Sequence, residues 1–376
     1  MKVLILHNTL NSCGGGERVA LHTIKALQDA SHEVDLGVVE RTDWKKVIEI
    51  TGIKLSRIPH ETYLTEKLRT FGIYQRLLLS YYALKLAKKY DLMINTHGDA
   101  MITSTHVTYM HFPTLLMVTG EWVWYTKYGK NPFWRAYFEP YKLLQNFLSK
   151  RALENTILLT NSKFSKNVIK KWLGKEALVV YPPVELHDYL PLAAYERRDD
   201  VVISIGRFAP EKNWHLLPKI ASKLPDTKFY LIGSLSGYYK SYFEHVLRLK
   251  EKLNAENLLI YPNAPHKLKL KLLSEAKVLL HLYPYEHFGI SVVEGQASGC
   301  IPVIHKSGGQ WLDIAENGKY GIGYDRLDIN DILECVKNAL SRWSLEEASK
   351  MSAHSLKFSD DRFRNEILKI AERCAE

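Results

Sequence analysis

Strand-like apolar runs alternate with helix-like amphipathic runs over most of the 376 residues. The alternation predicts parallel sheets with helices on both faces, because a parallel strand is usually reached through a crossover helix. The expected strands are 3–7, 34–39, 92–95, 105–110, 157–161, 178–181, 201–206, 229–233, 258–261, 278–282 and 301–305. The expected helices between them include 17–30, 77–89, 163–173, 216–224, 240–253 and 267–276. The pattern therefore predicts the α/β fold class.

The alternation stops at Pro182 and Pro183, and a polar stretch with a charge run follows before a new strand begins at Val201. Two prolines and a run of charges are typical of an interdomain linker. We expect Rossmann-like domains at residues 1–184 and 201–355, a linker at 185–200, and a C-terminal helix at 356–376 that packs back on the first domain. Ligands of doubly wound sheets bind at the carboxyl ends of strands, so two such domains facing each other would form a cleft between those ends.

The composition excludes some classes of protein and leaves others open. The net charge of +10 and pI near 9.1 suit nucleic acid, an anionic membrane or an anionic substrate, and equally a lysine-rich solvated surface. No apolar run approaches the roughly 20 residues that span a bilayer, and the apolar N-terminus predicts a first buried strand rather than a signal peptide. The cysteines show no C-x-x-C spacing; they are Cys13, Cys300, Cys335 and Cys374. We therefore expect a cytoplasmic protein without a zinc site or a disulfide framework.

Two glutamates, Glu286 and Glu294, have seven residues between them. The strand-like run 278–282 precedes them and a helix is expected at 292–298, so one acid lies in a loop and the other in the first helical turn. Carboxylates in these places can accept hydrogen bonds from sugar and ribose hydroxyls. The amides that can donate to ligand oxygens at the positive end of the helix are those of Phe288, Gly289 and Ile290. The stretch indicates a protein that handles a nucleotide-sugar.

The run 206–213, Gly-Arg-Phe-Ala-Pro-Glu-Lys-Asn, follows the first strand of the second domain. Arg207 and Lys212 therefore stand at the carboxyl end of a strand, where an anion would bind. Arginine can hold a diphosphate with two parallel hydrogen bonds, and lysine adds a point charge. A charged surface loop is the alternative, and the position before an amphipathic helix favours a functional one.

The first domain offers two weaker signals. The glycines Gly14 to Gly16 open a helix and allow the backbone to approach a phosphate closely, although a plain tight turn explains them equally well. Val19 stands where the dinucleotide fingerprint needs glycine, and no Gly-Lys-Ser/Thr of a P-loop follows. His111 ends an expected strand and could donate to a substrate hydroxyl, although a lone histidine is more often structural.

A further run, 299–309, predicts a helix end, a buried strand and a glycine-rich turn whose backbone could face a ligand. By itself this run is an ordinary helix–strand–turn. Residues 112–148 break the alternation, because aromatic side chains there are interleaved with lysine and arginine. Residues 67–89, earlier in the chain, show a similar pattern. Such patterns suit a membrane interface or an acceptor groove, whereas amphipathic helices mostly pack on their own domain.

In this order, the glycine loop, the histidine, the basic run and the two glutamates resemble the retaining glycosyltransferases of family 4. The resemblance spans nearly the whole chain, and it implies the GT-B fold, in which two Rossmann-like domains face each other across a cleft. Within the family the chain looks most like the dolichol-pathway α-1,2-mannosyltransferases, which extend lipid-linked oligosaccharides from GDP-mannose. The segments that carry this likeness are 14–19, 109–114, 180–183 and 287–294. The chain departs from them in showing no N-terminal membrane anchor.

The resemblance implies roles for the site residues. Arg207 and Lys212 would neutralise the donor diphosphate as the leaving group departs. Glu286 would hold hydroxyls of the donor sugar, Glu294 would hold those of the ribose, and His111 would contact the sugar from the other domain. The expected catalytic residues are thus His111, Arg207, Lys212 and Glu286. Backbone contacts would come from Gly15 and Gly16 at the diphosphate and from Phe288, Gly289 and Ile290 at the sugar.

In this family the leaving phosphate oxygen is thought to help deprotonate the acceptor, so no carboxylate nucleophile is required. No Asp-x-Asp metal motif occurs, and we expect no obligatory cofactor or metal beyond a GDP- or UDP-sugar as substrate. A glycosidase is excluded because both glutamates stand on one loop and helix, whereas a hydrolase places its carboxyls on either side of the scissile bond. The expected partners are a glycan or lipid-linked acceptor and the cytoplasmic surface of an anionic membrane.

Three alternatives remain beside a hexosyltransferase. A sugar-nucleotide epimerase of the same two-domain plan would bind a similar donor, but the aromatic and basic segment 112–148 argues against it. A non-catalytic paralogue would bind a nucleotide-sugar, but the intact basic run and glutamates argue against it. A nucleic-acid-binding protein is not expected, because no recognised module appears and the two acids would repel phosphates.

Overall fold

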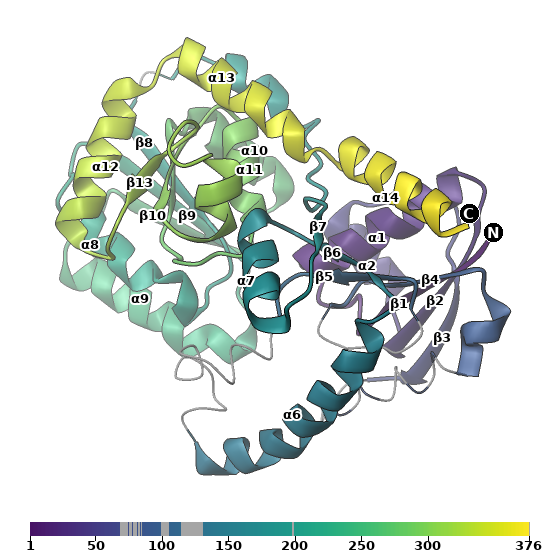
Figure 1. Cartoon of the computed structure of the whole chain (residues 1–376). Helices are drawn as coiled ribbons and strands as arrows, with labels where there is room; N and C mark the ends of the chain where they lie inside the picture. The colour runs from purple at the N-terminus through teal and green to yellow at the C-terminus, as the bar shows by residue number, and fades with distance from the viewer. Residues whose placement is uncertain are drawn as a thin grey trace. The chain divides into compact units, whose positions relative to one another are not determined.

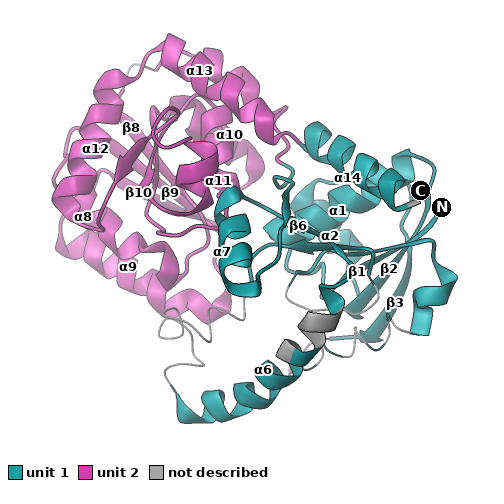
Figure 2. Ribbon diagram, viewed as in Figure 1, with its two compact units in different colours: residues 1–183, 360–376 teal, residues 184–359 magenta. Residues whose placement is uncertain are grey.

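The computed structural model describes residues 1–67, 85–98, 105–113, 131–197 and 199–375, together with positions 74, 77, 81 and 83. The chain forms two compact units (Figure 1 and Figure 2). The first unit holds residues 1–183 and 360–376, and the second holds residues 184–359. Much of the aromatic and basic segment, residues 114–130, and most of residues 68–84 lie outside the described part of the chain.

The first unit contains a parallel sheet with the strand order β3-β2-β1-β4-β5-β6-β7. Its strands are β1 (Lys2–His7), β2 (Glu33–Glu40), β3 (His60–Thr65), β4 (Leu92–Asn95), β5 (Val107–Met110), β6 (Ile157–Thr160) and β7 (Leu178–Val179). Its α-helices in the described residues are α1 (Gly15–Asp29), α2 (Trp44–Thr51), α6 (Pro132–Ala152), α7 (Lys163–Leu173) and α14 (Asp360–Ala375). The order reverses between β1 and β4, which is the switch point of a Rossmann sheet.

The second unit repeats this plan with the strand order β10-β9-β8-β11-β12-β13. Its strands are β8 (Val201–Ile205), β9 (Lys228–Gly233), β10 (Leu258–Pro262), β11 (Val278–His281), β12 (Ile301–His305) and β13 (Ile322–Tyr324). Its α-helices are α8 (Leu217–Ala221), α9 (Lys240–Lys252), α10 (His266–Glu275), α11 (Ile290–Ala297), α12 (Ile329–Arg342) and α13 (Leu345–Ser355). The switch point lies between β8 and β11.

Alternate residues of the central strands are buried on opposite faces of each sheet, as the strand period of two requires. In β1, Val3 and Ile5 join a core with α1 and α14, whereas Leu4 and Leu6 join a second cluster that includes Met93. In the second unit the larger cluster lies between the sheet and helices α8, α9 and α12. Both sheets are therefore covered on two faces, which confirms the predicted α/β class.

The expected linker at 185–200 is instead part of the second unit. A short helix, η3 (Leu190–Ala194), packs on α13, and Arg197 is 6% exposed. The Arg197 guanidinium donates to the carbonyl oxygens of Leu192, Ala276 and Ser298, and it lies over the Trp343 ring. The prolines that interrupt the alternation therefore mark the boundary between the units but no free linker behind it.

The C-terminal helix begins later than expected. Residues 356–359 belong to the second unit, and α14 begins at Asp360 within the first unit. Phe363, Ile367 and Ile370 on α14 are buried in the first unit's core. Helix α14 also contacts α1, where Arg364 lies 3.9 Å from the carboxylate of Asp29.

Candidate active site

The run 206–213 is anchored in the second unit directly after β8. Phe208 is fully buried and its ring meets the Phe243 ring edge-on at 4.8 Å between centroids. The Trp214 indole N–H donates to the carbonyl of Arg207 at 2.8 Å, and Asn213 takes a left-handed conformation with φ of 56°. These contacts turn the chain at the carboxyl end of β8 and fix the backbone that carries Lys212.

Lys212 and Glu286 form an ion pair at this switch point, with 2.6 Å between Nζ and Oε2. Lys212 comes from the loop after β8 and Glu286 from the loop after β11, so the pair joins the two strands between which the sheet order reverses. The side chains are only 13% and 19% exposed, and the Lys212 ammonium lies 4.4 Å from the centre of the Tyr283 ring. Burial alone would raise the pKa of Glu286, but the charge of Lys212, joined at acid pH by that of protonated His281, outweighs it and lowers the pKa to about 2.

His281 is a buried neighbour of this pair that sequence reasoning missed. It ends β11, its side chain is 1% exposed, and its Nε2 lies 3.6 Å from Oε2 of Glu286. Burial, with the nearby Lys212 charge, lowers the pKa of His281 to about 4, so its ring is neutral at pH 7. The available signal was a histidine that closes an apolar strand just before the glutamate loop.

The glycine-rich turn after β12 contacts the backbone of Glu286 and of its neighbour Tyr285. A Cβ on Gly308 would lie 2.3 Å from the carbonyl oxygen of Glu286, and Gly308 has φ of 75°. The Gly309 N–H donates to the same carbonyl at 2.8 Å, and the Ser307 hydroxyl accepts from the Tyr285 N–H at 2.8 Å. The sequence suggested that this turn could face a ligand, and in the structure its backbone holds the loop that carries Glu286.

Helix α11 begins at Ile290, two residues earlier than expected, because Gly289 takes φ of 115° and acts as its N-cap. Glu294 therefore lies in the second helical turn rather than the first. Its Oε1 accepts hydrogen bonds from the Lys269 ammonium at 2.9 Å and from the Tyr189 hydroxyl at 3.0 Å. Sequence reasoning missed Lys269 and Tyr189, which reach Glu294 from α10 and from the segment before η3.

The backbone at the start of α11 is the expected anion-binding end of that helix. Phe288 is 3% exposed, and its ring packs edge-on against Phe358. Gly289 makes no side-chain cap, so the first amides of α11 are not satisfied by a capping side chain. The amide of Ile290 therefore lies at the positive end of the helix dipole.

Arg207 lies apart from the two acids. Its side chain is 66% exposed, and its Nη2 lies 3.5 Å from Oε1 of Glu211 in the same loop. The structure thus brings Lys212 and Glu286 into contact, and it leaves Arg207 on the surface beside its own loop.

In the first unit, the glycine loop is held by an acid of its own helix. The Gly14 N–H donates to Oε2 of Glu17 at 2.8 Å, and Gly15 and Gly16 form the first residues of α1. The other oxygen, Oε1, lies 3.8 Å from Nε2 of the buried His7. Burial alone would raise the pKa of Glu17. The contact with His7 outweighs this effect, so the pKa of Glu17 lies below its ordinary value. A carboxylate therefore already occupies the positive end of this helix, which the sequence reading did not include.

His111 follows β5 and lies beside the glycine loop. Its Nε2 is 3.1 Å from the carbonyl oxygen of Thr96, and a Cβ built on Gly16 would lie 3.4 Å from the same nitrogen. Because a carbonyl oxygen only accepts, Nε2 carries the proton and donates it within the protein. The Thr96 hydroxyl is in turn 3.0 Å from Nδ1 of His7. The predicted residues Gly16 and His111 are therefore brought together, on a hydrogen-bonded network with His7 and Thr96.

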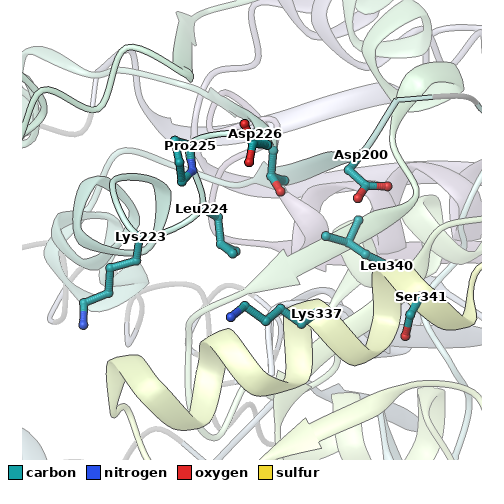
Figure 3. Close-up of a pocket in the computed structure, with 9 residues that line it drawn as sticks. Asp200, Lys223, Leu224, Pro225, Asp226, Lys337, Leu340 and Ser341 are labelled. Carbon is teal, nitrogen blue, oxygen red and sulfur yellow. The ribbon is translucent and has the colours of Figure 1, made fainter.

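A hollow of about 450 Å³ opens at the other end of the second sheet (Figure 3). Its lining residues are Asp200, Lys223, Leu224, Pro225, Asp226, Thr227, Lys337, Leu340 and Ser341. Asp200 and Thr227 precede β8 and β9, so this hollow lies at the amino ends of the strands. It is therefore at the opposite edge from the Lys212–Glu286 pair. Among the described residues, no group of three or more histidine, cysteine or acidic side chains could hold a metal ion.

Comparison with known proteins agrees with this geometry. The family described as "Glycosyl transferases group 1" matches residues 194–357. The chain is 26% identical to a human GDP-Man:Man(3)GlcNAc(2)-PP-Dol alpha-1,2-mannosyltransferase, over 99% of the chain and 87% of that protein. A Xenopus laevis protein of the same name is 27% identical over 98% of the chain and 87% of its own length.

Solved structures share the fold. Anabaena Alr3699/HepE in complex with UDP and glucose has a TM-score of 0.71 at 18% identity, and the match covers 99% of both chains. The sucrose-phosphate synthase of Thermosynechococcus elongatus has a TM-score of 0.75 at 15% identity, again covering 99% of both chains. These comparisons do not favour the epimerase or the non-catalytic alternative. The chain is therefore a hexosyltransferase of the GT-B fold that carries a glycosyl transferases group 1 domain at residues 194–357.

Proposed function

We propose that the chain transfers a hexose, with retention, from a nucleotide-diphosphate sugar to a glycan or lipid-linked acceptor. The observation that carries the proposal is the Lys212–Glu286 ion pair at the switch point of the second sheet, 2.6 Å between charged atoms. A cation and an acid in contact suit the junction between a diphosphate and a sugar, because the cation faces the phosphate oxygens and the acid accepts from hydroxyls. GDP-mannose is the first donor to test, since it is the donor in the names of the relatives.

In this proposal Lys212 acts on the leaving group. Negative charge grows on the diphosphate oxygen as the sugar departs, and a cation held in place by Glu286 stabilises that charge without having to reorganise. Glu286 accepts from the sugar hydroxyls, and its low pKa keeps it ionised across the working pH range. Arg207, whose side chain is more exposed than that of Lys212, supplies a second cation at the rim of the site.

The remaining roles rest on backbone and on the first unit. The amides of Phe288, Gly289 and Ile290 donate to sugar oxygens, and Glu294 holds the ribose. Gly15 and Gly16 lie beside the diphosphate, and His111 contacts the sugar.

The test is a panel of GDP-mannose, UDP-glucose, UDP-GlcNAc and UDP-galactose, screened for thermal stabilisation and for donor hydrolysis. At least one donor should raise the melting temperature, and Lys212→Met should lower turnover by about 10²- to 10³-fold, as the loss of one charge-stabilising group does. Lys219→Met, an exposed lysine on α8, is the matched control and should leave turnover unchanged. If no donor binds, or if Lys212→Met retains full activity while folded, the proposal is wrong.

Helix α6 supports a lipid-linked acceptor. Its large exposed apolar side chains recur with helical spacing on one face: Phe133 is 71% exposed, Leu143 69% and Phe147 67%. The first unit carries 29 lysines and arginines against 20 acids, whereas the second carries 22 against 21. An apolar helix face on a unit with a net charge of +9 suits the surface of an anionic bilayer, where a lipid-linked acceptor would reside. None of the helices in the described residues is long and apolar enough to cross a membrane.

Vesicle co-sedimentation tests this contact. Full-length protein should bind vesicles that contain phosphatidylglycerol more tightly than vesicles of phosphatidylcholine alone, and Phe133→Ser with Phe147→Ser should weaken binding. Tyr238→Ser, at a side chain in the second unit that is 84% exposed, is the control. Equal binding of all variants would contradict the α6 surface, and self-association that the α6 changes abolish would show that a second copy covers it.

A further inference from the structure

Glu294 is held by two groups that the proposed function does not use. The Tyr189 hydroxyl and the Lys269 ammonium both donate to its Oε1, at 3.0 Å and 2.9 Å. The Lys269 ammonium also lies 5.0 Å from the centre of the Tyr189 ring, so the three groups contact one another in a closed triangle. Each corner comes from a different element: the segment before η3, helix α10 and helix α11.

The triangle is built into the interior of the second unit. Tyr189 is 4% exposed, and the side chains of Lys269 and Glu294 are 18% and 15% exposed. The Tyr189 ring meets the His266 ring edge-on at 5.9 Å, so α10 contacts Tyr189 through two positions three residues apart, on one helix face. A phenol fixed on both sides has little freedom to move, and its hydroxyl therefore limits the rotation of Glu294.

The charge of Lys269 answers a second requirement. Burying an acid that has no cation of its own is unfavourable, so Glu294 needs a counter-charge to stay in its partly buried place. Lys269 makes the Glu294 site neutral as a pair, in the same way that Lys212 neutralises Glu286. Each of the two glutamates thus has a lysine from another element as its partner.

We propose that Tyr189 and Lys269 are positioning residues that hold Glu294 in the orientation in which it binds the ribose of the nucleotide donor. The inference rests on the proposed function, because it takes Glu294 as the ribose-binding acid. Tyr189 and Lys269 act through Glu294, so their contribution to binding should disappear when the ribose offers no hydroxyl groups.

The experiment measures binding rather than turnover. Isothermal titration calorimetry with GDP and with 2′,3′-dideoxy-GDP is carried out on the full-length wild type and on Tyr189→Phe, Lys269→Met and Glu294→Gln, with UDP and 2′,3′-dideoxy-UDP as the pair if GDP does not bind. Tyr189→Phe removes only the hydroxyl, and Lys269→Met keeps the length of the side chain. The matched controls are Tyr195→Phe and Lys271→Met, two exposed positions on the same segment and the same helix.

We expect Tyr189→Phe and Lys269→Met to weaken the binding of GDP by about 3- to 10-fold and the binding of dideoxy-GDP by less than about 2-fold. A substitution that acts through one contact has no effect once that contact is removed. Lys269→Arg should recover part of the loss, and the controls should match the wild type. Thermal unfolding checks that each variant is folded.

The outcomes separate the two proposals. One outcome is that Glu294→Gln abolishes the preference for GDP over dideoxy-GDP, whereas Tyr189→Phe and Lys269→Met weaken the binding of both nucleotides equally. The positioning role is then wrong and the ribose role of Glu294 stands. If Glu294→Gln leaves the preference unchanged, Glu294 does not bind the ribose, and both proposals about it fail. If neither GDP nor UDP binds the wild type, the proposed function itself is overturned.

Discussion

Removing the ammonium of Lys212 should destabilise the second unit by a predictable amount. The pKa of Glu286 falls from its ordinary value of 4.5 to about 2 in the folded protein, which corresponds to about 3 kcal/mol of favourable interaction with the ionised acid. Lys212 is the largest favourable contributor, so Lys212→Met leaves a carboxylate that is 19% exposed without its main partner. Breaking a pair of this kind costs roughly 3 kcal/mol or more.

A double-mutant cycle isolates the pair from other effects of the substitutions. Glu286→Gln, Lys212→Met and the double variant should give a coupling energy of about 2 kcal/mol at pH 7, because the double variant removes both charges and leaves neither unpaired. The control cycle uses Lys228 and Asp199, a pair that is 54% and 65% exposed and should couple by less than about 1 kcal/mol. Hydrogen exchange of the β8 amides, read by mass spectrometry, reports the opening free energy of the second unit within the intact chain.

The pH dependence gives the same prediction an independent check. The folded pKa of Glu286 lies below the unfolded one, so its contribution to stability is complete above about pH 4.5 and is lost as the pH falls toward 2. In Lys212→Met this part of the acid dependence should shrink. A coupling energy no larger than that of the exposed control pair, with an unchanged acid dependence, would refute the reasoning.

Three further changes test other parts of the structure. Gly308→Ala should lower the free energy of unfolding by at least about 2 kcal/mol in thermal denaturation and weaken donor binding, since its Cβ would lie 2.3 Å from the Glu286 carbonyl oxygen. The control Gly237→Ala, where the added Cβ has open space, should lower it by less than about 0.5 kcal/mol. Glu17→Ala should lower stability by about 1 kcal/mol through loss of the α1 cap, and Glu17→Gln should keep part of it; equal losses in thermal denaturation would contradict the capping role. Arg197→Met should cost about 3 kcal/mol, because three buried carbonyls lose their donor, and unchanged exchange of the β11 amides would count against this estimate.

The elements that the sequence predicted well are short buried strands and a helix with clear caps. Strands β4 and β12 are mostly apolar and buried, and the amphipathic helix α7 lies between Ser162 and Gly174, so all three have the predicted bounds. Strand β3 reads His-Glu-Thr-Tyr-Leu-Thr at the edge of its sheet and is mostly solvent-accessible, so no apolar pattern marks it. Strand β13 has only three residues, too few for any periodicity to appear.

The candidate site divides in the same way. Lys212 and Glu286 could be predicted because each follows a strand of its own within a specific run of residues, and parallel strands bring their carboxyl ends to one edge. Lys269 could not be predicted, since α10 alternates lysine and leucine and nothing local distinguishes the lysine that faces Glu294 from its neighbours. Contacts of this kind are set by how helices pack over long sequence separations. The roles assigned to all the site residues, including Lys212 and Glu286, remain predictions.

The return of α14 to the first unit has a consequence for how the protein is made. The core of that unit is completed by Phe363, Ile367 and Ile370, which leave the ribosome only after the 176 residues of the second unit. At about 5–20 residues per second, the first sheet waits roughly 10–35 s for its last helix. During that interval the apolar face that α14 later covers is exposed on the nascent chain. We therefore expect the half-made first unit to be a chaperone substrate, and the two units to finish folding in the reverse of their order in the sequence.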